Sequence, residues 1–201
     1  MLTVGLTGGF ASGKTFVGRA LAALGCHLIQ ADELGHAVLE PGAEAYEAAV
    51  SEFGPGILRA DGTIDRRTLA SEVFGKPERL AVLNAIVHPA VFRREDQLIR
   101  EARERDPTGI AVVEAAILIE TGSYRKFDRL IVVISSEELQ VERAMTRGGL
   151  TRDEVLARIA RQMPAPAKLK FADYVIDTSG SEDDTLRQTR EVCDALKRQA
   201  L

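Results

Sequence analysis

The residues best suited to chemistry follow a short apolar run at the start of the chain. Gly8, Gly13, Lys14 and Thr15 have the spacing Gly-x-x-x-x-Gly-Lys-Thr, which is typical of a phosphate-binding loop between a strand and a helix. Glycines leave room for backbone N–H groups at the helix start to face a polyphosphate. Lys14 is expected to bring positive charge to the β- and γ-phosphates, and the Thr15 hydroxyl to ligate Mg²⁺. The sequence therefore predicts a nucleoside triphosphate site; the alternative is a glycine-rich turn without a ligand.

A second candidate is Asp32, which follows the apolar run 27–29. If that run is a strand of the same parallel sheet, Asp32 lies at its carboxyl edge, where the ligands of such sheets bind. A carboxylate there can accept the proton of an attacking hydroxyl and orient it in line with a γ-phosphate. The alternative role, capping the following helix, would not exclude catalysis. We therefore predict that Asp32 is the general base.

Arginine residues gather in the segment 137–169, which is predicted to form two short helices joined at paired glycines. Arg143 and Arg147 lie four residues apart, so both can point the same way. A hinged helix pair rich in arginine is typical of a mobile lid over phosphates, whereas the alternative is a charged surface facing water. We favour Arg147 for catalysis because it lies next to the hinge. The arginines of the segment are Arg143, Arg147, Arg152, Arg158 and Arg161.

The ends of these two helices carry capping residues. The motif from Ser135 to Glu138 is expected to start the first helix, and Gly148-Gly149 to end it. A capping box from Thr151 to Glu154 should start the second. That second helix is predicted to form one apolar stripe with polar residues beside it: Val155, Ile159 and Met163 on the stripe, Arg158 and Gln162 next to it.

Short apolar runs alternate with helical patterns along the chain. This alternation predicts an α/β protein with a central parallel sheet of about five strands and helices on both faces. The first helix is expected over residues 13–24, with Gly25 as its stop, and the last from about Ser181, burying Leu186, Val192 and Leu196. About 80 residues separate the second and third runs, and so long an insertion usually builds a binding surface. The predicted strands are 2–6, 27–29, 110–113, 130–134 and 174–176.

Composition narrows the class of protein. The chain has 201 residues, 45% of them hydrophobic, which is enough for one sizeable core. Its net charge of −4 disfavours a general nucleic-acid binder. No run approaches the roughly 20 apolar residues that span a bilayer, and the N-terminus enters a strand directly, so we expect an unprocessed cytoplasmic protein without membrane contact. Cys26 and Cys193 match no metal spacing and are interpreted as buried thiols.

Taken in order, these motifs resemble the dephospho-CoA kinase family across nearly the whole chain. The phosphate loop alone occurs in many kinases, but the combination of Asp-Gly-x-Ile-Asp-Arg, Val-Phe and His-Pro is much more specific. The resemblance implies Mg²⁺-dependent transfer of the ATP γ-phosphoryl to the ribose 3′-hydroxyl of dephospho-CoA, the last step of CoA synthesis. The matching segments are Gly5 to Thr15, Ala31-Asp32, Glu40-Pro41-Gly42, Asp61 to Arg66, Val73-Phe74, His88-Pro89, Leu118-Ile119-Glu120, and Gln140 with Arg143 and Arg147.

The same resemblance implies an organisation for the chain. It indicates a single P-loop kinase unit over 1–201, with a core of 1–31, 109–136 and 170–201. Residues 32–108 would form a helical substrate-binding insertion, and residues 137–169 the lid. The expected substrates are ATP and dephospho-CoA, without nucleic acid, and the expected state is a monomer or a weak homo-oligomer.

Roles carry over to matching positions. Asp32, Lys14 and Arg147 are implied to be catalytic, and Thr15 to bind the metal. The implied acceptor contacts are Asp32, Arg66, His88 and Leu118, although a histidine before a proline fits a structural role as well. The implied ATP contacts are Gly8, Gly9, Ala11, Ser12, Gly13, Lys14, Thr15, Phe16 and Arg143.

Several positions depart from the family pattern. Ala11 and Phe16 stand where Gly and Thr are usual, and alanine prefers negative φ, which constrains the loop. Gln30 replaces a frequent acidic residue, and Ala116 a proline. The turn 178–180 lacks the usual asparagine, which leaves the adenine contacts near the last strand unassigned.

Two other functions compete with this reading. A GTPase switch needs an Asn-Lys-x-Asp motif, but the single asparagine, Asn84, is followed by Ala85 and Ile86. Another small-molecule kinase, such as a nucleoside monophosphate kinase, stays an alternative because AMP and dephospho-CoA both present an adenosine-like group near a phosphate.

Overall fold

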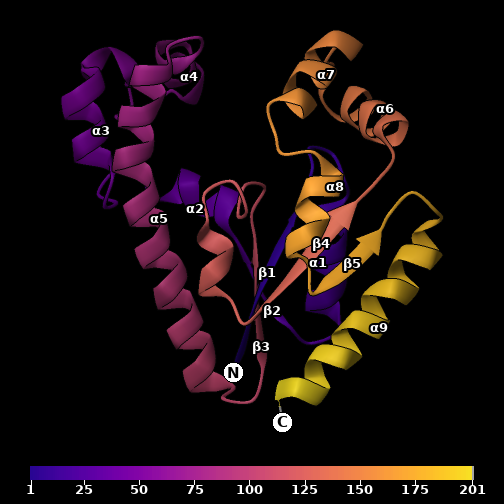
Figure 1. Ribbon diagram of the computed structural model, residues 1–201. Coiled ribbons are helices and arrows are strands. Elements are labelled where there is room, and N and C mark those ends of the chain that lie inside the picture. The colour runs from indigo at the N-terminus through magenta and orange to yellow at the C-terminus, as the bar shows by residue number, and fades with distance from the viewer. Residues whose placement is uncertain (201) are drawn as a thin grey trace. The chain divides into compact units, whose positions relative to one another are not determined.

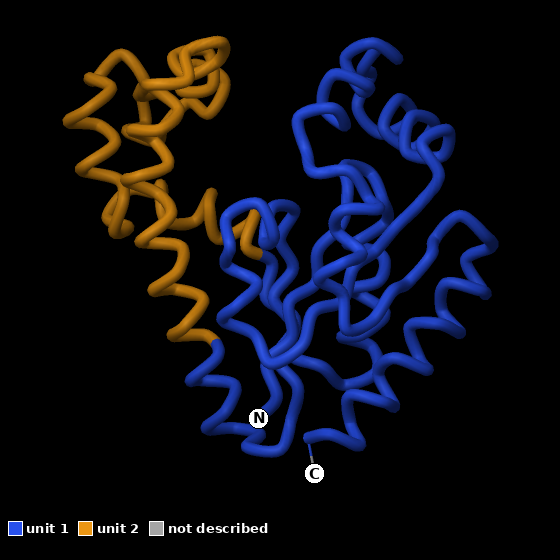
Figure 2. Tube along the Cα trace, viewed as in Figure 1, with its two compact units in different colours: residues 1–30, 99–201 blue, residues 31–98 orange. Residues whose placement is uncertain are grey.

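The computed structural model describes residues 1–200 and groups them into two compact units (Figure 2). One unit contains residues 1–30 and the chain from 99 onward, and the other contains residues 31–98. The first is built on a five-stranded parallel sheet with the order β2-β3-β1-β4-β5 (Figure 1). All five predicted strands are confirmed, each extended by one or two residues: β1 (Leu2–Gly8), β2 (His27–Gln30), β3 (Ile110–Glu114), β4 (Arg129–Ile134) and β5 (Tyr174–Asp177).

The central strand β1 sends alternate side chains to the two faces of the sheet. Val4 and Leu6 are fully buried in the main hydrophobic cluster, which the sheet shares with α1 (Lys14–Ala23) and α9 (Glu182–Ala200). Gly5 faces the other way, where the side chains of Phe127 and Leu118 lie 2.9 and 3.0 Å from the position of an ideal Cβ. Both faces are therefore covered, as the sequence predicts.

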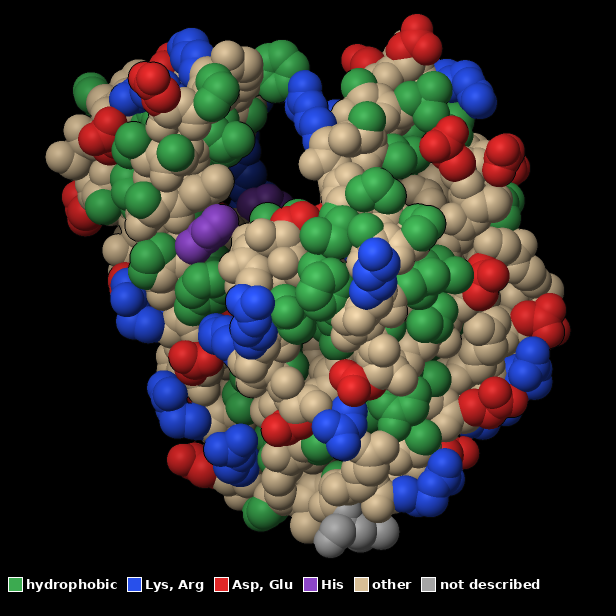
Figure 3. Space-filling view, in the orientation of Figure 1, with side chains coloured by type: hydrophobic (Ala, Val, Ile, Leu, Met, Phe, Trp, Pro, Cys, Tyr) green, Lys and Arg blue, Asp and Glu red, His purple; other side chains and the backbone are tan. Residues whose placement is uncertain are grey.

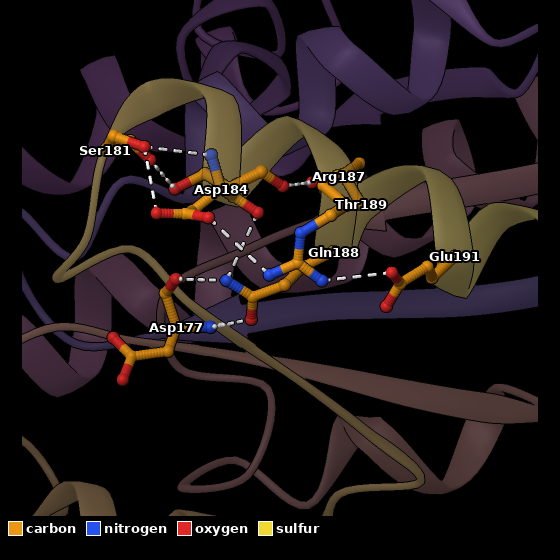
Figure 4. A network of polar contacts seen from close by, with 8 residues as sticks. Asp177, Ser181, Asp184, Arg187, Gln188, Thr189 and Glu191 are labelled. Atoms are coloured by element: carbon orange, nitrogen blue, oxygen red, sulfur yellow. Dashed lines mark hydrogen bonds and ion pairs between the residues drawn. The ribbon is translucent and has the colours of Figure 1, made fainter.

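The first and last helices occupy their predicted places. Helix α1 is followed by Gly25, whose φ of 94° allows the turn into β2. Helix α9 starts after Ser181, whose Oγ accepts the Asp184 N–H at 3.1 Å. Gln188 binds both backbone groups of Asp177, so the second turn of α9 is fastened to the end of β5 (Figure 4). Val192 and Leu196 are buried as expected, whereas Leu186 is only half-buried.

Two predictions about the lid segment, residues 137–169, are wrong in detail. The residue that caps α6 (Glu137–Gly148) is Ser136, which accepts the Leu139 N–H, and not Ser135. Helix α7 (Arg152–Ala160) has the predicted capping box, but it ends before Met163. Pro164 explains why the helix does not continue, because its ring would clash with the Ala160 carbonyl and it has no N–H to donate to that oxygen. The segment continues through α8 (Ala165–Lys168) and the short 3₁₀ turn η3 (Leu169–Phe171); another 3₁₀ turn, η2 (Ser123–Lys126), precedes β4.

Residues 31–98 are helical and have two small cores of their own. Val38, Ala45, Ala90 and Val91 form one cluster, and the second consists of Ala49, Ile57, Ile64 and Leu69. The elements are α2 (Ala31–Ala37), α3 (Tyr46–Phe53), the 3₁₀ turn η1 (Pro55–Ile57), α4 (Arg66–Val73) and the first part of α5 (Pro77–Arg105). The last part of α5 groups with the sheet, where Ala102 is buried and Asp106 meets His27 at 3.1 Å. The functional division into core, insertion and lid stays a prediction.

The two cysteines of the chain lie close together in the core. Cys26 and Cys193 are both buried, as predicted, with free thiols whose Sγ atoms lie 3.8 Å apart. Burial, together with the neighbouring Cys193, raises the pKa of Cys26 to about 12.

Within residues 1–200, no helix is both long enough and apolar enough to cross a membrane. Acidic and basic side chains are interspersed over the face shown in Figure 3.

Candidate functional site

The phosphate loop, residues 8–15, joins β1 to α1 in a conformation that requires glycine at two positions. A Cβ on Gly8 would lie 2.3 Å from the Val133 carbonyl oxygen, and Gly13 has a φ of 88°. A side chain at either position would clash with backbone or strain it. The Lys14 Nζ donates to the carbonyl oxygens of Gly8 and Gly9 at 3.2 and 2.9 Å. The lysine is therefore held against the loop whose phosphates it is predicted to bind.

Ala11 has a φ of 55° and is the one non-glycine residue with positive φ among residues 1–200. The left-handed region costs an L residue about 1 to 2 kcal/mol. Although alanine replaces the usual glycine here, the backbone keeps the left-handed conformation that glycine adopts easily. The surrounding packing must hold Ala11 in that conformation.

The side-chain oxygens of Thr15 and Glu114, which could both ligate a metal ion, lie together beside the phosphate loop. The Thr15 hydroxyl donates to Glu114 Oε1 at 2.7 Å, and the Glu114 Oε2 accepts from Gln30 Nε2 at 3.2 Å. Glu114 ends β3 and is 7% exposed. Sequence analysis missed this residue, although an acidic residue directly after the apolar run 110–113 was the signal. No cluster of three or more His, Cys, Asp or Glu able to hold a metal exists in the described chain. A hydroxyl, one carboxylate and phosphate oxygens nevertheless suit Mg²⁺, which keeps several waters.

Thr178 links the phosphate loop to the lid segment. Its hydroxyl donates to the Ser12 carbonyl oxygen at 2.9 Å. Its own oxygens accept from Arg143, whose Nη1 and Nη2 lie at 2.9 and 2.7 Å from Oγ1 and O. Arg143 Nη1 also donates to Ser135 Oγ at 3.1 Å, which is the role that Ser135 has in place of capping. Three hydrogen bonds therefore fix the plane of this guanidinium.

A pocket of about 80 Å³ lies beside the fixed arginine, at the start of α1 and α9. Arg147, exposed one turn beyond Arg143, lines the same pocket. The nearby Ser12 Oγ is the one buried side-chain N or O atom without a hydrogen-bond partner among the described residues. Such an atom costs free energy unless a ligand or water satisfies it, so the loop suits a polar ligand. The pocket is lined in part by Gly13, Phe16, Arg143, Arg147, Thr178 and Glu182.

An ion pair between a buried lysine and a partly exposed glutamate anchors the end of the lid segment. Lys168 is 1% exposed, and its Nζ lies 2.8 Å from Glu120 Oε1 and donates to the Ala116 carbonyl oxygen at 3.2 Å. Glu120 also accepts the Met163 N–H at 3.1 Å. Although burial opposes ionisation, the hydrogen bond from Lys168 and those from the backbone hold the pKa of Glu120 below its ordinary value. Sequence analysis missed Lys168 because a lysine near a helix end usually faces water.

The predicted acceptor residues Asp32 and Arg66 belong to the unit of residues 31–98. Asp32 is exposed in the first turn of α2, two positions after β2 ends. Because α2 already begins at Ala31, Asp32 does not occupy the capping position. Arg66 is the exposed first residue of α4, and its Nη2 lies 3.3 Å from Glu40 Oε1.

The other two predicted acceptor residues are less accessible. His88 is half-buried within α5, with its ring centroid 6.0 Å from that of Phe92. Leu118 belongs to the sheet unit, where it is 4% exposed and packs beneath β1. A residue so deeply buried offers almost no surface to an acceptor, so the contact of Leu118 with the acceptor stays a prediction. The predicted ATP residues thus come together in one unit, and Asp32, Arg66 and His88 belong to the other.

Comparison with known proteins identifies the family. Residues 2–184 match the family dephospho-CoA kinase. The dephospho-CoA kinase of Geobacillus kaustophilus is 44% identical over 187 residues, which cover 93% of this chain and 92% of that protein. A solved structure, TT1252 from Thermus thermophilus, has a TM-score of 0.80 and 33% identity over 97% of both chains. The dephospho-CoA kinase from Campylobacter jejuni has a TM-score of 0.72 and 26% identity, covering 99% of this chain and 98% of that one. The predicted P-loop kinase fold is confirmed, and the chain belongs to the dephospho-CoA kinase family.

Proposed function

We propose that this chain transfers the γ-phosphoryl of ATP to the ribose 3′-hydroxyl of dephospho-CoA, giving CoA and ADP. The observation that carries the proposal is the family match over residues 2–184, which includes a phosphate loop that has Gly8, Gly13 and Lys14. Phosphoryl transfer of this kind depends mainly on positioning and on neutralising charge at the transferred group.

On the ATP side, the backbone N–H groups of the phosphate loop and the Lys14 ammonium bind the phosphates. Thr15 and Glu114 are the residues that would hold Mg²⁺, which neutralises phosphate charge when bound. Glu114 accepts the Thr15 hydroxyl at 2.7 Å and so orients that oxygen. Gly9 and Ser12, which are also implied ATP contacts, belong to the same loop. Phe16, a further implied ATP contact, lies in the first turn of α1.

The two lid arginines have different proposed roles toward ATP. Arg143, held by Thr178 and Ser135, forms a fixed wall of the 80 Å³ pocket and suits the flat nucleotide base or the α-phosphate. Arg147 is exposed one turn later, so its guanidinium is free to swing toward the transferring phosphoryl. We propose that Arg147 contributes mainly in the transition state, which would lower kcat more than ATP affinity in its absence.

On the acceptor side, Asp32 takes the proton of the 3′-hydroxyl and aims that oxygen at the γ-phosphorus. Arg66 supplies positive charge for the acceptor's own phosphates, and His88 a further contact. Leu118 is 4% exposed, and no contact of its side chain with the acceptor is proposed.

The test compares two neighbouring carboxylates in the first turn of α2, Asp32 and Glu33. Asp32→Asn keeps the shape of the side chain but cannot take up a proton, so transfer to dephospho-CoA should fall by about 10² to 10⁴ while ATP affinity stays near that of the parent. Glu33→Gln is the matched control and should retain full turnover. CoA formation measures transfer, and titration measures ATP binding. Wild-type turnover in Asp32→Asn would show that the base lies elsewhere.

Acceptor choice decides between the proposed reaction and a nucleoside monophosphate kinase. A coupled ADP assay with dephospho-CoA, AMP and pantetheine should show turnover with dephospho-CoA and little with the others. A preference for AMP would overturn the proposal.

A cytoplasmic location and a monomeric or weakly associating state are also proposed, on the sequence expectations alone. Cell fractionation tests the first and light scattering at several concentrations the second.

A further inference from the structure

The two lid helices and the phosphate loop share one small apolar core. Val141 and Ala144 of α6 and Val155 of α7 are buried there, and the loop residues Phe10 and Ala11 pack against them. Other members of this cluster are Leu150, Leu156 and Ile159. The loop is therefore not an isolated glycine-rich turn, because two of its non-glycine residues pack against the core of the lid segment.

A hydrogen bond joins the same two regions. The Phe10 N–H donates to Gln162 Oε1 at 2.7 Å, between residues 152 positions apart. Gln162 lies just beyond the end of α7, where its own N–H donates to the Ile159 carbonyl oxygen at 3.0 Å. The position of the Gln162 side chain is thus set by the helix end, and the N–H that it engages belongs to the phosphate-binding loop.

Arg158 completes the contact from α7. Its Cζ lies 5.6 Å from the centroid of the Phe10 ring, within the range of a cation–π interaction. Phe10 therefore meets the lid through its backbone, its ring face and its apolar edge. The left-handed φ of the next residue, Ala11, indicates that packing here is strong enough to hold a strained backbone.

We propose that Gln162 is a positioning residue, which ties the end of the lid to the Phe10 N–H and thereby sets Arg158 and the phosphate loop in one fixed arrangement. The expected effect on kcat rests on the proposed function, to which this inference adds a positioning residue. Neither Gln162 nor Phe10 needs to touch the reacting atoms. Loss of the hydrogen bond should loosen the lid and lower the fraction of bound ATP that lies in the reactive geometry.

The main test replaces Gln162 by Met, which has a similar length but no amide oxygen to accept the Phe10 N–H. Amides of α7 should exchange hydrogen about fivefold faster, as expected for one lost hydrogen bond, while those of α9 stay unchanged. The kcat for CoA formation should fall by about the same factor, with a smaller change in the KM for ATP. Gln162→Glu keeps an acceptor oxygen and should restore the exchange rates of α7.

Gln199→Met is the matched control, because that glutamine also makes side-chain hydrogen bonds, to Arg129 and Tyr174, at the far end of α9. It should leave both kcat and the α7 exchange rates unchanged. Phe10→Leu keeps the N–H but removes the ring from Arg158, and should have a smaller effect than Gln162→Met on exchange in α7.

Three outcomes would overturn the proposal. Unchanged α7 exchange in Gln162→Met would mean that the hydrogen bond does not hold the lid. Faster exchange with unchanged kcat would mean that it does not position reacting groups. A uniform rise in exchange through α7 and α9 would mean that Gln162 only stabilises the fold. Hydrogen exchange is measured without the acceptor substrate. An inactive parent enzyme would therefore overturn the proposed function, whereas the contact between Gln162 and Phe10 could still be tested by exchange.

Discussion

The residues predicted to bind ATP and those predicted to bind the acceptor differ in how firmly the protein holds them. Lys14, Thr15 and Arg143 each have hydrogen-bond partners within 3.2 Å, from the loop itself or from neighbouring strand ends. In the unit of residues 31–98, Asp32 is exposed, and Arg66 and Glu40 meet with 55% of each side chain exposed. An ion pair so open to solvent contributes little stability and exchanges partners easily.

This difference has a physical meaning for phosphoryl transfer. Groups that stabilise developing charge are most effective when they need not reorganise during the reaction, and the ATP side meets that condition. Acceptor groups must release a product that differs from the substrate by one phosphoryl, and exposed side chains can do so without disturbing a core. The comparison predicts that changes to the firmly held groups on the ATP side affect turnover and folding together, whereas loss of the exposed Arg66 affects acceptor affinity alone.

The largest effect is expected from Gly8→Ala. Its Cβ would meet the Val133 carbonyl oxygen at 2.3 Å, and backbone cannot move aside cheaply. The loop should shift, with a loss in kcat/KM for ATP of about 10² or more. Gly9→Ala is the control, because its nearest neighbour is the flexible Gln140 side chain at 3.3 Å. Steady-state kinetics and thermal melts of both variants measure the effect, and equal losses in the two would contradict the steric explanation.

A medium effect is expected from Arg66→Ala on the acceptor side. Loss of one charge-assisted contact should raise the KM for dephospho-CoA about tenfold and leave the KM for ATP and the melting temperature unchanged. Arg67→Ala, an exposed neighbour in the same turn, is the control. If Arg66→Ala lowered kcat without changing acceptor KM, Arg66 would act in catalysis as the ATP-side residues do, and the comparison would fail.

Sequence alone predicts the sheet and the phosphate loop because both depend on local patterns. Five apolar runs became five strands, and the spacing of Gly8, Gly13 and Lys14 fixes where the loop lies. The partners of those residues come from distant parts of the chain, so Glu114 beside Thr15 and Gln162 beside Phe10 were not predicted. Ser135 binds Arg143 while Ser136 caps α6, so a choice between two adjacent serines is resolved by tertiary contacts. The end of α7 near Pro164 is a local signal that the sequence analysis did not weigh.

The smallest effect concerns the ion pair of Lys168 with the partly exposed Glu120, and it tests whether charge holds this end of the lid segment. The pKa of Glu120 lies below its ordinary value of 4.5, because hydrogen bonds from Lys168 and the backbone outweigh burial. A carboxyl with a lowered pKa in the folded state stabilises the fold above its unfolded pKa and loses that contribution as pH falls through the folded pKa. Glu120→Gln should therefore melt about 2 to 4 °C below the parent at pH 7, with the difference shrinking toward zero below about pH 4.5. Glu104→Gln, an exposed carboxylate on α5, is the control and should melt with the parent at every pH. A difference that stays constant down to pH 3 would show that Glu120 acts through packing and hydrogen-bond geometry, and that charge does not fasten this end of the lid.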